Sequence, residues 1–148
     1  MIIIRDTREK EYKGWYFEED GFCHGTLDRK MDTGDYTIEG KEGLICIERK
    51  GAITEFAANC VQDRFKRELA RMSDFQHAYL ILEFDMFDLM RYPQTAAGVV
   101  ARKTKITGKF ILKCLHEFEM EYGIKSVLAG NFGKEVAYSV LKRVEQNN

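Results

Sequence analysis

Two carboxylates and one ammonium stand where neighbouring strands of this 148-residue chain can bring them together. Glu48 and Lys50 end the apolar run 44–47 and are separated by one residue, so on a strand both side chains point to the same face. Asp35 opens the preceding strand and can add a second carboxylate there. Hard oxygen ligands of this kind suit Mg²⁺, which binds a few carboxylates together with waters and phosphate oxygens. The pattern indicates metal-assisted cleavage of a phosphodiester.

Each of these residues also has a plainer interpretation. Asp35 follows Gly34 and could simply cap that turn, Glu48 could be a solvated strand end, and Lys50 an ordinary surface lysine. Arg49 points to the opposite face of an ideal strand, where a structural salt bridge is the alternative to a role in a site. Taken together, Asp35 and Glu48 are interpreted as metal ligands. Lys50 would hold the attacking water and offset charge that develops at phosphorus.

The pattern extends beyond these residues and resembles the nuclease domain of the XPF-type structure-specific endonucleases, a branch of the PD-(D/E)XK nucleases. The matching pieces are, in chain order, Asp6-Thr7-Arg8-Glu9, Thr26-Leu27, Gly34-Asp35-Tyr36, Glu48-Arg49-Lys50, Arg64-Phe65 and Tyr79-Leu80-Ile81-Leu82-Glu83-Phe84. A lone Glu-x-Lys is weak evidence, but the three acidic motifs in this order form a specific signal. The resemblance is dense from Ile2 to Phe84 and loose beyond.

The resemblance implies roles for the first polar cluster, which could otherwise be a polar helix start. By this resemblance, the carboxylates of Asp6 and Glu9 would support the metal ligands or bind a second cation. Arg8 would neutralise these carboxylates or bind phosphate. Arg49 belongs to the family's site motif. The implied cofactor is Mg²⁺ or Mn²⁺, and no nucleotide cofactor is expected.

The resemblance also implies a substrate and an assembly. The substrate would be DNA, branched or flapped, cleaved in repair or recombination by a homodimer or with a partner subunit. A catalytically inactive DNA-binding or scaffold subunit of the same fold is one alternative. A same-fold nuclease that acts on duplex ends or in restriction is another.

Two positions depart from the family pattern. An acidic residue is usual four positions after the motif lysine, where this chain has Thr54 and then Glu55. A glutamine often follows the Arg-Phe pair by three positions, where this chain has Glu68. Both changes fall beside the expected site, so they bear on its metal affinity.

The arrangement of apolar residues predicts the elements that carry these motifs. The expected strands are 2–5, 15–17, 22–31, 36–38, 44–49, 79–84 and 126–129, and the expected helices are 53–72 with an N-cap at Thr54, 109–122 and 132–144. A hairpin at 40–43 makes the strands of Asp35 and Glu48 antiparallel neighbours. The pattern predicts an α/β class, an α/β/α sandwich with a mixed sheet, and the resemblance implies the restriction-endonuclease-like fold.

Composition limits what the domain organisation and the location of the protein can be. With 45% apolar residues, the chain is expected to be a single domain over 1–148, without the helix-hairpin-helix module of the family. The four cysteines never form Cys-x-x-Cys and are interpreted as buried free thiols, which fits a reducing compartment. No apolar stretch approaches the ~20 residues that span a bilayer. An intracellular, soluble protein without membrane contact is expected.

A net charge of −1 means that attraction to DNA must come from local clusters. The stretch 91–113 holds basic residues and no acid, which is a solvated run or a phosphate-tracking loop. A second row shares one face of the expected helix 53–72. The predicted DNA-binding residues are Arg64, Arg67, Arg71, Arg102, Lys103, Lys105 and Lys109. Such contacts would give sequence-independent affinity that falls with salt.

Overall fold

A six-stranded mixed sheet forms the centre of the molecule. The computed structural model describes residues 1–9, 13–95, 98–99 and 104–147. The strands, in the order β2-β1-β3-β4-β5-β8, are Ile3–Arg5 (β1), Thr26–Asp28 (β2), Tyr36–Ile38 (β3), Ile45–Lys50 (β4), His77–Leu82 (β5) and Lys125–Leu128 (β8). β3 is antiparallel to both β1 and β4, and the remaining neighbours are parallel.

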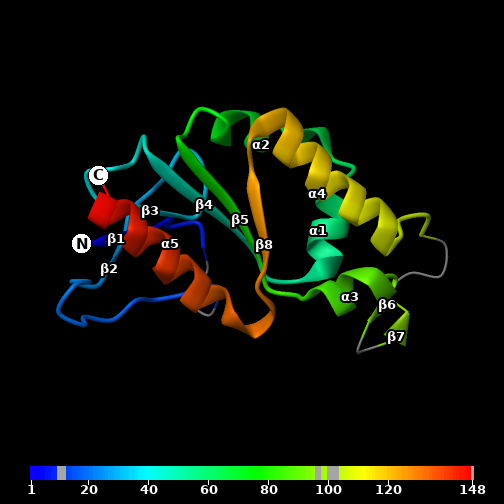
Figure 1. Ribbon diagram of the computed structural model, residues 1–148, viewed down its shortest axis with the longest axis horizontal. Coiled ribbons are helices and arrows are strands. Elements are labelled where there is room, and N and C mark those ends of the chain that lie inside the picture. Colours follow the sequence, from blue (N-terminus) through cyan, green and yellow to red (C-terminus); the bar gives the residue numbers. More distant parts are fainter. Residues whose placement is uncertain (10–12, 96–97, 100–103, 148) are drawn as a thin grey trace.

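Helices cover both faces of this sheet (Figure 1). They are Ile53–Asn59 (α1), Asp63–Met72 (α2), Met86–Arg91 (α3), Gly108–Tyr122 (α4) and Gly133–Asn147 (α5), with a 3₁₀ turn at Gly130–Phe132 (η1) and a small hairpin of Gln94–Thr95 (β6) and Gly98–Val99 (β7). α5 lies on one face, and α1, α2 and α4 lie on the other. The predicted α/β/α sandwich is confirmed. None of the described helices has the length and apolar character to cross a membrane.

Strand β4 shows how the sequence pattern places the polar residues. Cys46 packs into the core under α1, α2 and α4, whereas Ile45 and Ile47 pack into the core under α5. The alternation continues to the end of the strand, because side chains on a strand point to opposite faces in turn. Glu48 therefore lies on the α1–α2 side of the sheet, and Arg49 on the α5 side.

The predicted single helix 53–72 is wrong, because two helices share its apolar stripe. α1 ends at Asn59 and α2 begins at Asp63, and Gln62 between them is extended (φ −101°, ψ 125°). Phe56 and Phe65 still enter one core, so the helical period continues across the break. The predicted N-cap at Thr54 is also wrong, since that residue lies inside the first turn of α1.

The N-terminal third contains less strand than predicted. The expected strand 22–31 shrinks to β2, which pairs parallel to β1. The expected strand 15–17 is absent as a strand, and its aromatic residues instead pack in the core on the α5 side. Trp15 stacks on Tyr36 with ring centres 5.1 Å apart and donates its backbone N–H to the Tyr36 hydroxyl at 2.6 Å. Side-chain packing, rather than a strand ladder, holds this segment.

Helix α3 was not predicted, although its N-terminus carries a capping box. Asp85 accepts a hydrogen bond from the backbone of Asp88 at 2.8 Å, and Asp88 accepts one from the backbone of Asp85 at 3.1 Å. This reciprocal pair satisfies two donors that a helix start leaves free. The helices predicted at 109–122 and 132–144 and the strand at 126–129 are confirmed within a few residues.

Candidate active site

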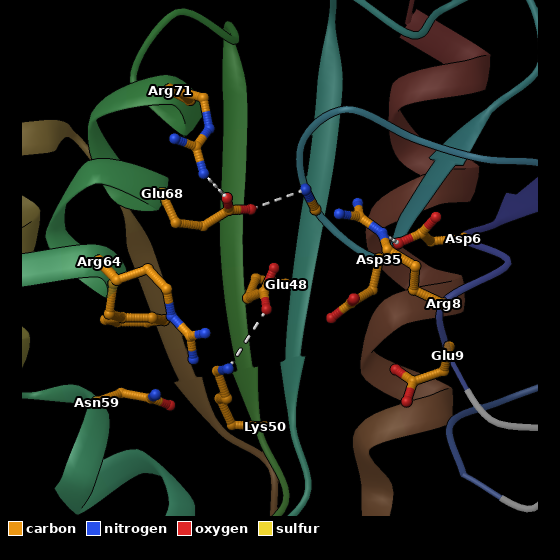
Figure 2. Close-up of a pocket in the computed structure, with 12 residues that line it drawn as sticks. Asp6, Arg8, Glu9, Asp35, Glu48, Lys50, Asn59, Arg64, Glu68 and Arg71 are labelled. Atoms are coloured by element: carbon orange, nitrogen blue, oxygen red, sulfur yellow. Dashed lines mark hydrogen bonds and ion pairs between the residues drawn. The ribbon is translucent and has the colours of Figure 1, made fainter. Parts of the chain in front are cut away.

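Strands β3 and β4 bring Asp35 and Glu48 together. Tyr36 pairs with Ile47 across the antiparallel ladder, which places Asp35 beside Glu48 one step further along. The Asp35 N–H donates to the Ile47 carbonyl at 2.8 Å and so extends this pairing. Figure 2 shows the two carboxylates turned toward each other, with the ammonium of Lys50 nearby.

These side chains line a cleft with a volume of about 550 Å³. The β3–β4 edge and the N-terminal segment form one side, and α1 and α2 form the other (Figure 2). Its lining residues are Asp6, Arg8, Glu9, Gly34, Asp35, Glu48, Lys50, Asn59, Arg64, Phe65, Glu68 and Arg71. A smaller hollow of about 250 Å³ shares several of these residues and adds Lys13, Arg49 and Glu55. The cleft thus collects residues from five parts of the chain: the N-terminal segment, the start of β3, the end of β4, α1 and α2.

Asp35 is held in place by the backbone of the neighbouring strand. One of its carboxylate oxygens, Oδ2, accepts a hydrogen bond from the Arg49 N–H at 2.8 Å. Burial raises the pKa of Asp35 to about 6, and the negative charge of Glu9 adds to the increase, while the Arg49 hydrogen bond opposes it. A nearby cation would stabilise the charged form of this carboxylate.

Glu48 is 9% exposed and is more deeply buried than Asp35. Burial raises its pKa well above the ordinary value, and the adjacent charge of Asp35 raises it further. The Lys50 Nζ lies 3.5 Å from Glu48 Oε1 and offsets part of this effect. Ionisation of both acids would therefore place more negative charge at the centre of the cleft than Lys50 alone offsets.

The Lys50 ammonium is fixed by three contacts. Besides Glu48, it pairs with Glu55 Oε1 at 3.4 Å, and it lies 5.0 Å from the centre of the Phe65 ring. Glu55, one position later than the family pattern has its acid, thus reaches the motif lysine from the first turn of α1. Lys50 and Glu48 lie on the same face of β4, as predicted.

Arg49 lies on the opposite face of β4, as the strand period predicts. Its guanidinium forms ion pairs with Glu83 and, at 3.7 Å, with Glu9. The same group lies over the Trp15 ring, 5.7 Å from the ring centre. Arg49 borders the smaller hollow but does not line the main cleft. These contacts give Arg49 a structural role that ties β4 to the N-terminal segment. A part in catalysis stays a prediction.

The N-terminal cluster lies at the cleft wall, with its carboxylates engaged. Asp6 Oδ2 accepts from Arg8 Nε at 2.7 Å, and Asp6 Oδ1 accepts from the backbone N–H of Met31 at 3.0 Å. The Asp6 N–H donates to the Asp35 carbonyl at 2.8 Å, which joins the end of β1 to the start of β3. Glu9 pairs with Arg49 as above. The structure brings these residues to the site, and their support of a second cation stays a prediction.

Helix α2 supplies two of its three predicted basic residues to the cleft. Arg64 and Arg71 line it, whereas Arg67 is exposed outside it. Within the described chain, no ion pair engages Arg64, and Figure 2 shows its guanidinium directed toward Lys50 and Glu48. Arg71 pairs with Glu68. Among the described residues, Arg64 is therefore the cation of α2 that both lines the cleft and has no ion pair.

The remaining predicted DNA-binding residues lie elsewhere or outside the described structure. Arg102 and Lys103 fall outside the described residues. Lys105 and Lys109 are exposed near the start of α4 and do not line the cleft.

Sequence reasoning missed two cleft residues. Asn59 ends α1, is 7% exposed, and has a side-chain oxygen with no hydrogen-bond partner in the described structure. Glu68 was noted only as a departure from the family pattern, and it lies on the cleft side of α2. The signal for Asn59 was a polar residue within an apolar helical stripe. Neither residue could be placed at the site before the helices were packed.

The site fits a hard divalent cation held by few protein ligands. Asp35 and Glu48 offer carboxylate oxygens, and among the described residues no three His, Cys, Asp or Glu side chains gather as a metal-binding group. Mg²⁺ accepts such a partial set, because it keeps several waters and takes up substrate phosphates. The cleft lining has five acids and four bases, so a divalent cation would make its balance positive.

Comparisons with known proteins identify the fold. No family model matches the sequence, and no curated protein matches it. Two solved structures match with a TM-score of 0.65 and 15% identity: XPF from Aeropyrum pernix, and XPF from Aeropyrum pernix in complex with DNA. The chain has an XPF-like nuclease fold. The matches cover 98% and 99% of this chain but only 61% and 65% of the XPF chains, so this chain spans less than two thirds of their length.

The XPF-like fold supports the coarse part of the sequence interpretation. At 15% identity the likeness concerns the fold alone, and one of the XPF structures contains DNA. The fold and the cleft are thus two independent observations, one from the comparison and one from the residues of this chain.

Proposed function

We propose that this protein is a DNA endonuclease that depends on Mg²⁺ or Mn²⁺ and hydrolyses phosphodiester bonds. The observation that carries the proposal is the convergence of Asp35, Glu48 and Lys50 in one cleft, on a fold like that of XPF. Both carboxylates have raised pKa values because they are buried side by side. Such a pair is costly unless a cation is shared between them.

The residues of the cleft have distinct tasks in this proposal. Asp35 and Glu48 would hold the cation, which supplies Lewis-acid polarisation of the phosphodiester when bound. Lys50 positions the attacking water with its ammonium and offsets the charge that grows on the phosphate oxygens. Arg64 holds a neighbouring phosphate, since no acid of the described chain competes for its guanidinium.

Branched or flapped DNA is the proposed substrate, in repair or recombination. The support is the likeness to XPF, one structure of which holds DNA. Basic side chains on α2 and at the start of α4 give a contact surface without any visible means of reading bases. Recognition would therefore depend on the shape of the DNA and on salt. A second copy or a partner subunit would add to that selectivity.

Cleavage assays on defined DNA test the proposal. Flap, fork, junction and linear substrates are incubated with Mg²⁺, Mn²⁺ or EDTA, and products are resolved on denaturing gels. We expect metal-dependent cleavage that favours branched substrates. Asp35→Ala should abolish it, and Lys50→Ala should lower kcat roughly 10²- to 10³-fold, as expected when a charge-stabilising donor is removed.

Two exposed residues outside the cleft provide matched controls. Glu117→Gln on α4 and Arg143→Ala on α5 change the same kinds of charge and should cleave like the wild type. Cleavage that survives Asp35→Ala would discard the site assignment. Tight DNA binding without metal-dependent cleavage would instead identify a DNA-binding scaffold.

A further inference from the structure

Glu68 crosses the cleft from α2 to the turn that carries Asp35. Its Oε1 accepts a hydrogen bond from the backbone N–H of Gly34 at 3.0 Å, and its Oε2 pairs with Arg71 on the next turn of the helix. Figure 2 shows both interactions at one end of the cleft. Both oxygens of Glu68 thus already accept a hydrogen bond from the protein.

The turn held by Glu68 lies tightly against β4. Gly34 has φ +79°, and a Cβ added there would lie 2.2 Å from the Cys46 Sγ. The residue that follows, Asp35, is fixed by its N–H to the Ile47 carbonyl and by its carboxylate to the Arg49 N–H. The Gly34 N–H is the point at which α2 is connected to this arrangement.

We propose that Glu68 is a positioning residue that sets the place of Asp35 through the Gly34 turn. The inference rests on the proposed function, because it assigns Asp35 the task of holding the cation. Without an acceptor at position 68, the half-buried turn loses its connection to α2 and the Asp35 carboxylate samples more positions. Cation affinity and turnover then fall, and Arg71 also loses its ion-pair partner.

Two substitutions separate this role from a ligand or base role. Glu68→Met keeps the length and helix propensity of the side chain and removes the acceptor, and Glu68→Ala replaces it if the Met variant does not fold. Glu68→Gln removes the charge but keeps an oxygen that accepts from the Gly34 N–H. A positioning residue tolerates the Gln change, whereas a metal ligand or general base does not.

The variants are compared by Mn²⁺ titration calorimetry and by steady-state cleavage of a flap substrate. We expect Glu68→Met to weaken Mn²⁺ binding and lower kcat by roughly tenfold or more, the usual range for groups that orient a ligand. KM for DNA should not rise, because both variants remove a negative charge from the cleft and release Arg71, and Glu68→Gln should restore Mn²⁺ binding and kcat to near wild-type values. Asp63→Asn, at the exposed start of α2, is the control for a lost acid on this helix.

Amide hydrogen exchange gives a readout that does not depend on cleavage. The Gly34 N–H should exchange faster in Glu68→Met than in the wild type, and at the wild-type rate in Glu68→Gln. Equal losses in the Gln and Met variants would overturn the positioning role, and so would a Met variant with wild-type Mn²⁺ binding. A wild-type protein that binds Mn²⁺ but does not cleave DNA refutes the proposed function, and the calorimetry still decides the role of Glu68.

Discussion

At the scale of single residues, the buried pair of Asp35 and Glu48 determines how the site responds to pH. In the folded protein the pKa of Asp35 is about 6, against an ordinary value of 3.8. Between these values the folded protein keeps a proton that the unfolded chain has released, so folding stability falls as pH rises through this window. Glu48 shifts in the same direction. Each of the two carboxylates destabilises the metal-free protein when it loses its proton.

Neutralising Asp35 should therefore stabilise the metal-free protein. We expect Asp35→Asn to raise the free energy of unfolding at pH 8 by up to about 3 kcal/mol in EDTA, with a smaller gain as pH falls toward 5. Thermal unfolding at several pH values measures this. In Mg²⁺ the order should reverse, because only the wild type gains from binding. Asp74→Asn, an exposed acid outside the cleft, should change neither curve, and a destabilised Asp35→Asn protein in EDTA would contradict the electrostatic account.

The central residues could be predicted because their placement depends on short-range rules. The two-residue period of a strand put Glu48 and Lys50 on one face, and the hairpin put Asp35 opposite them. Asn59 and Glu68 could not be placed, because their approach depends on how α1 and α2 pack on the sheet. The period of apolar residues identifies the buried face of a helix, but not the position along a strand at which the helix packs.

At the scale of elements, the turn before β3 limits what the site tolerates. Gly34 has a positive φ and no room for a Cβ, whereas Gly40 has a similar φ of +84° with nothing within 4 Å of the added atom. The two glycines form a matched pair. A side chain at Gly34 would meet both backbone strain and a steric clash, whereas a side chain at Gly40 would meet backbone strain alone.

Substitution of these glycines should have unequal effects. We expect Gly40→Ala to cost about 1 kcal/mol of stability, as for other residues forced into this region. Gly34→Ala should cost roughly 2 kcal/mol more, since β4 or the turn must move, and it should weaken Mn²⁺ binding as well. Chemical denaturation and calorimetry provide the two measurements. Equal losses in both variants would show that the turn does not press on β4.

The elements differ in how well their sequence revealed them. The strands β4 and β5 and the helices α4 and α5 have long apolar patterns that match their structure. The break between α1 and α2 has no Gly or Pro to mark it, and the shared core preserves the apolar period across it. The extended segment near Trp15 has strand-like composition but packs its rings into the core instead of joining a ladder.

At the scale of the whole molecule, the mixed sheet and its two helical layers could be predicted from the order of patterns. The parallel pairing of β1 with β2 could not be predicted, because it depends on how the long segment between these two strands brings β2 back beside β1. The proposed DNA binding also belongs to this scale, since a net charge of −1 means that attraction to DNA must come from local basic residues. Arg64 is the basic residue of α2 that both lines the cleft and has no ion pair in the described chain.

Removal of Arg64 should weaken DNA binding in a salt-dependent way. We expect Arg64→Ala to raise the Kd for an uncleaved flap in EDTA roughly three- to tenfold and to reduce the slope of log Kd against log salt by about 1. Fluorescence anisotropy over a series of salt concentrations measures both. Arg143→Ala, exposed on α5 across the sheet, should leave the slope unchanged. Parallel curves for all three proteins would exclude a phosphate contact at Arg64.

The central claim is that Asp35 and Glu48 share one cation beside Lys50, and Mn²⁺-soaked crystals test it most directly. An anomalous difference map should show a peak within bonding distance of both carboxylates, and this peak should disappear in Asp35→Asn crystals grown in the same way. A Mn²⁺ peak at another position, or no peak between these carboxylates under saturating Mn²⁺, would contradict the account.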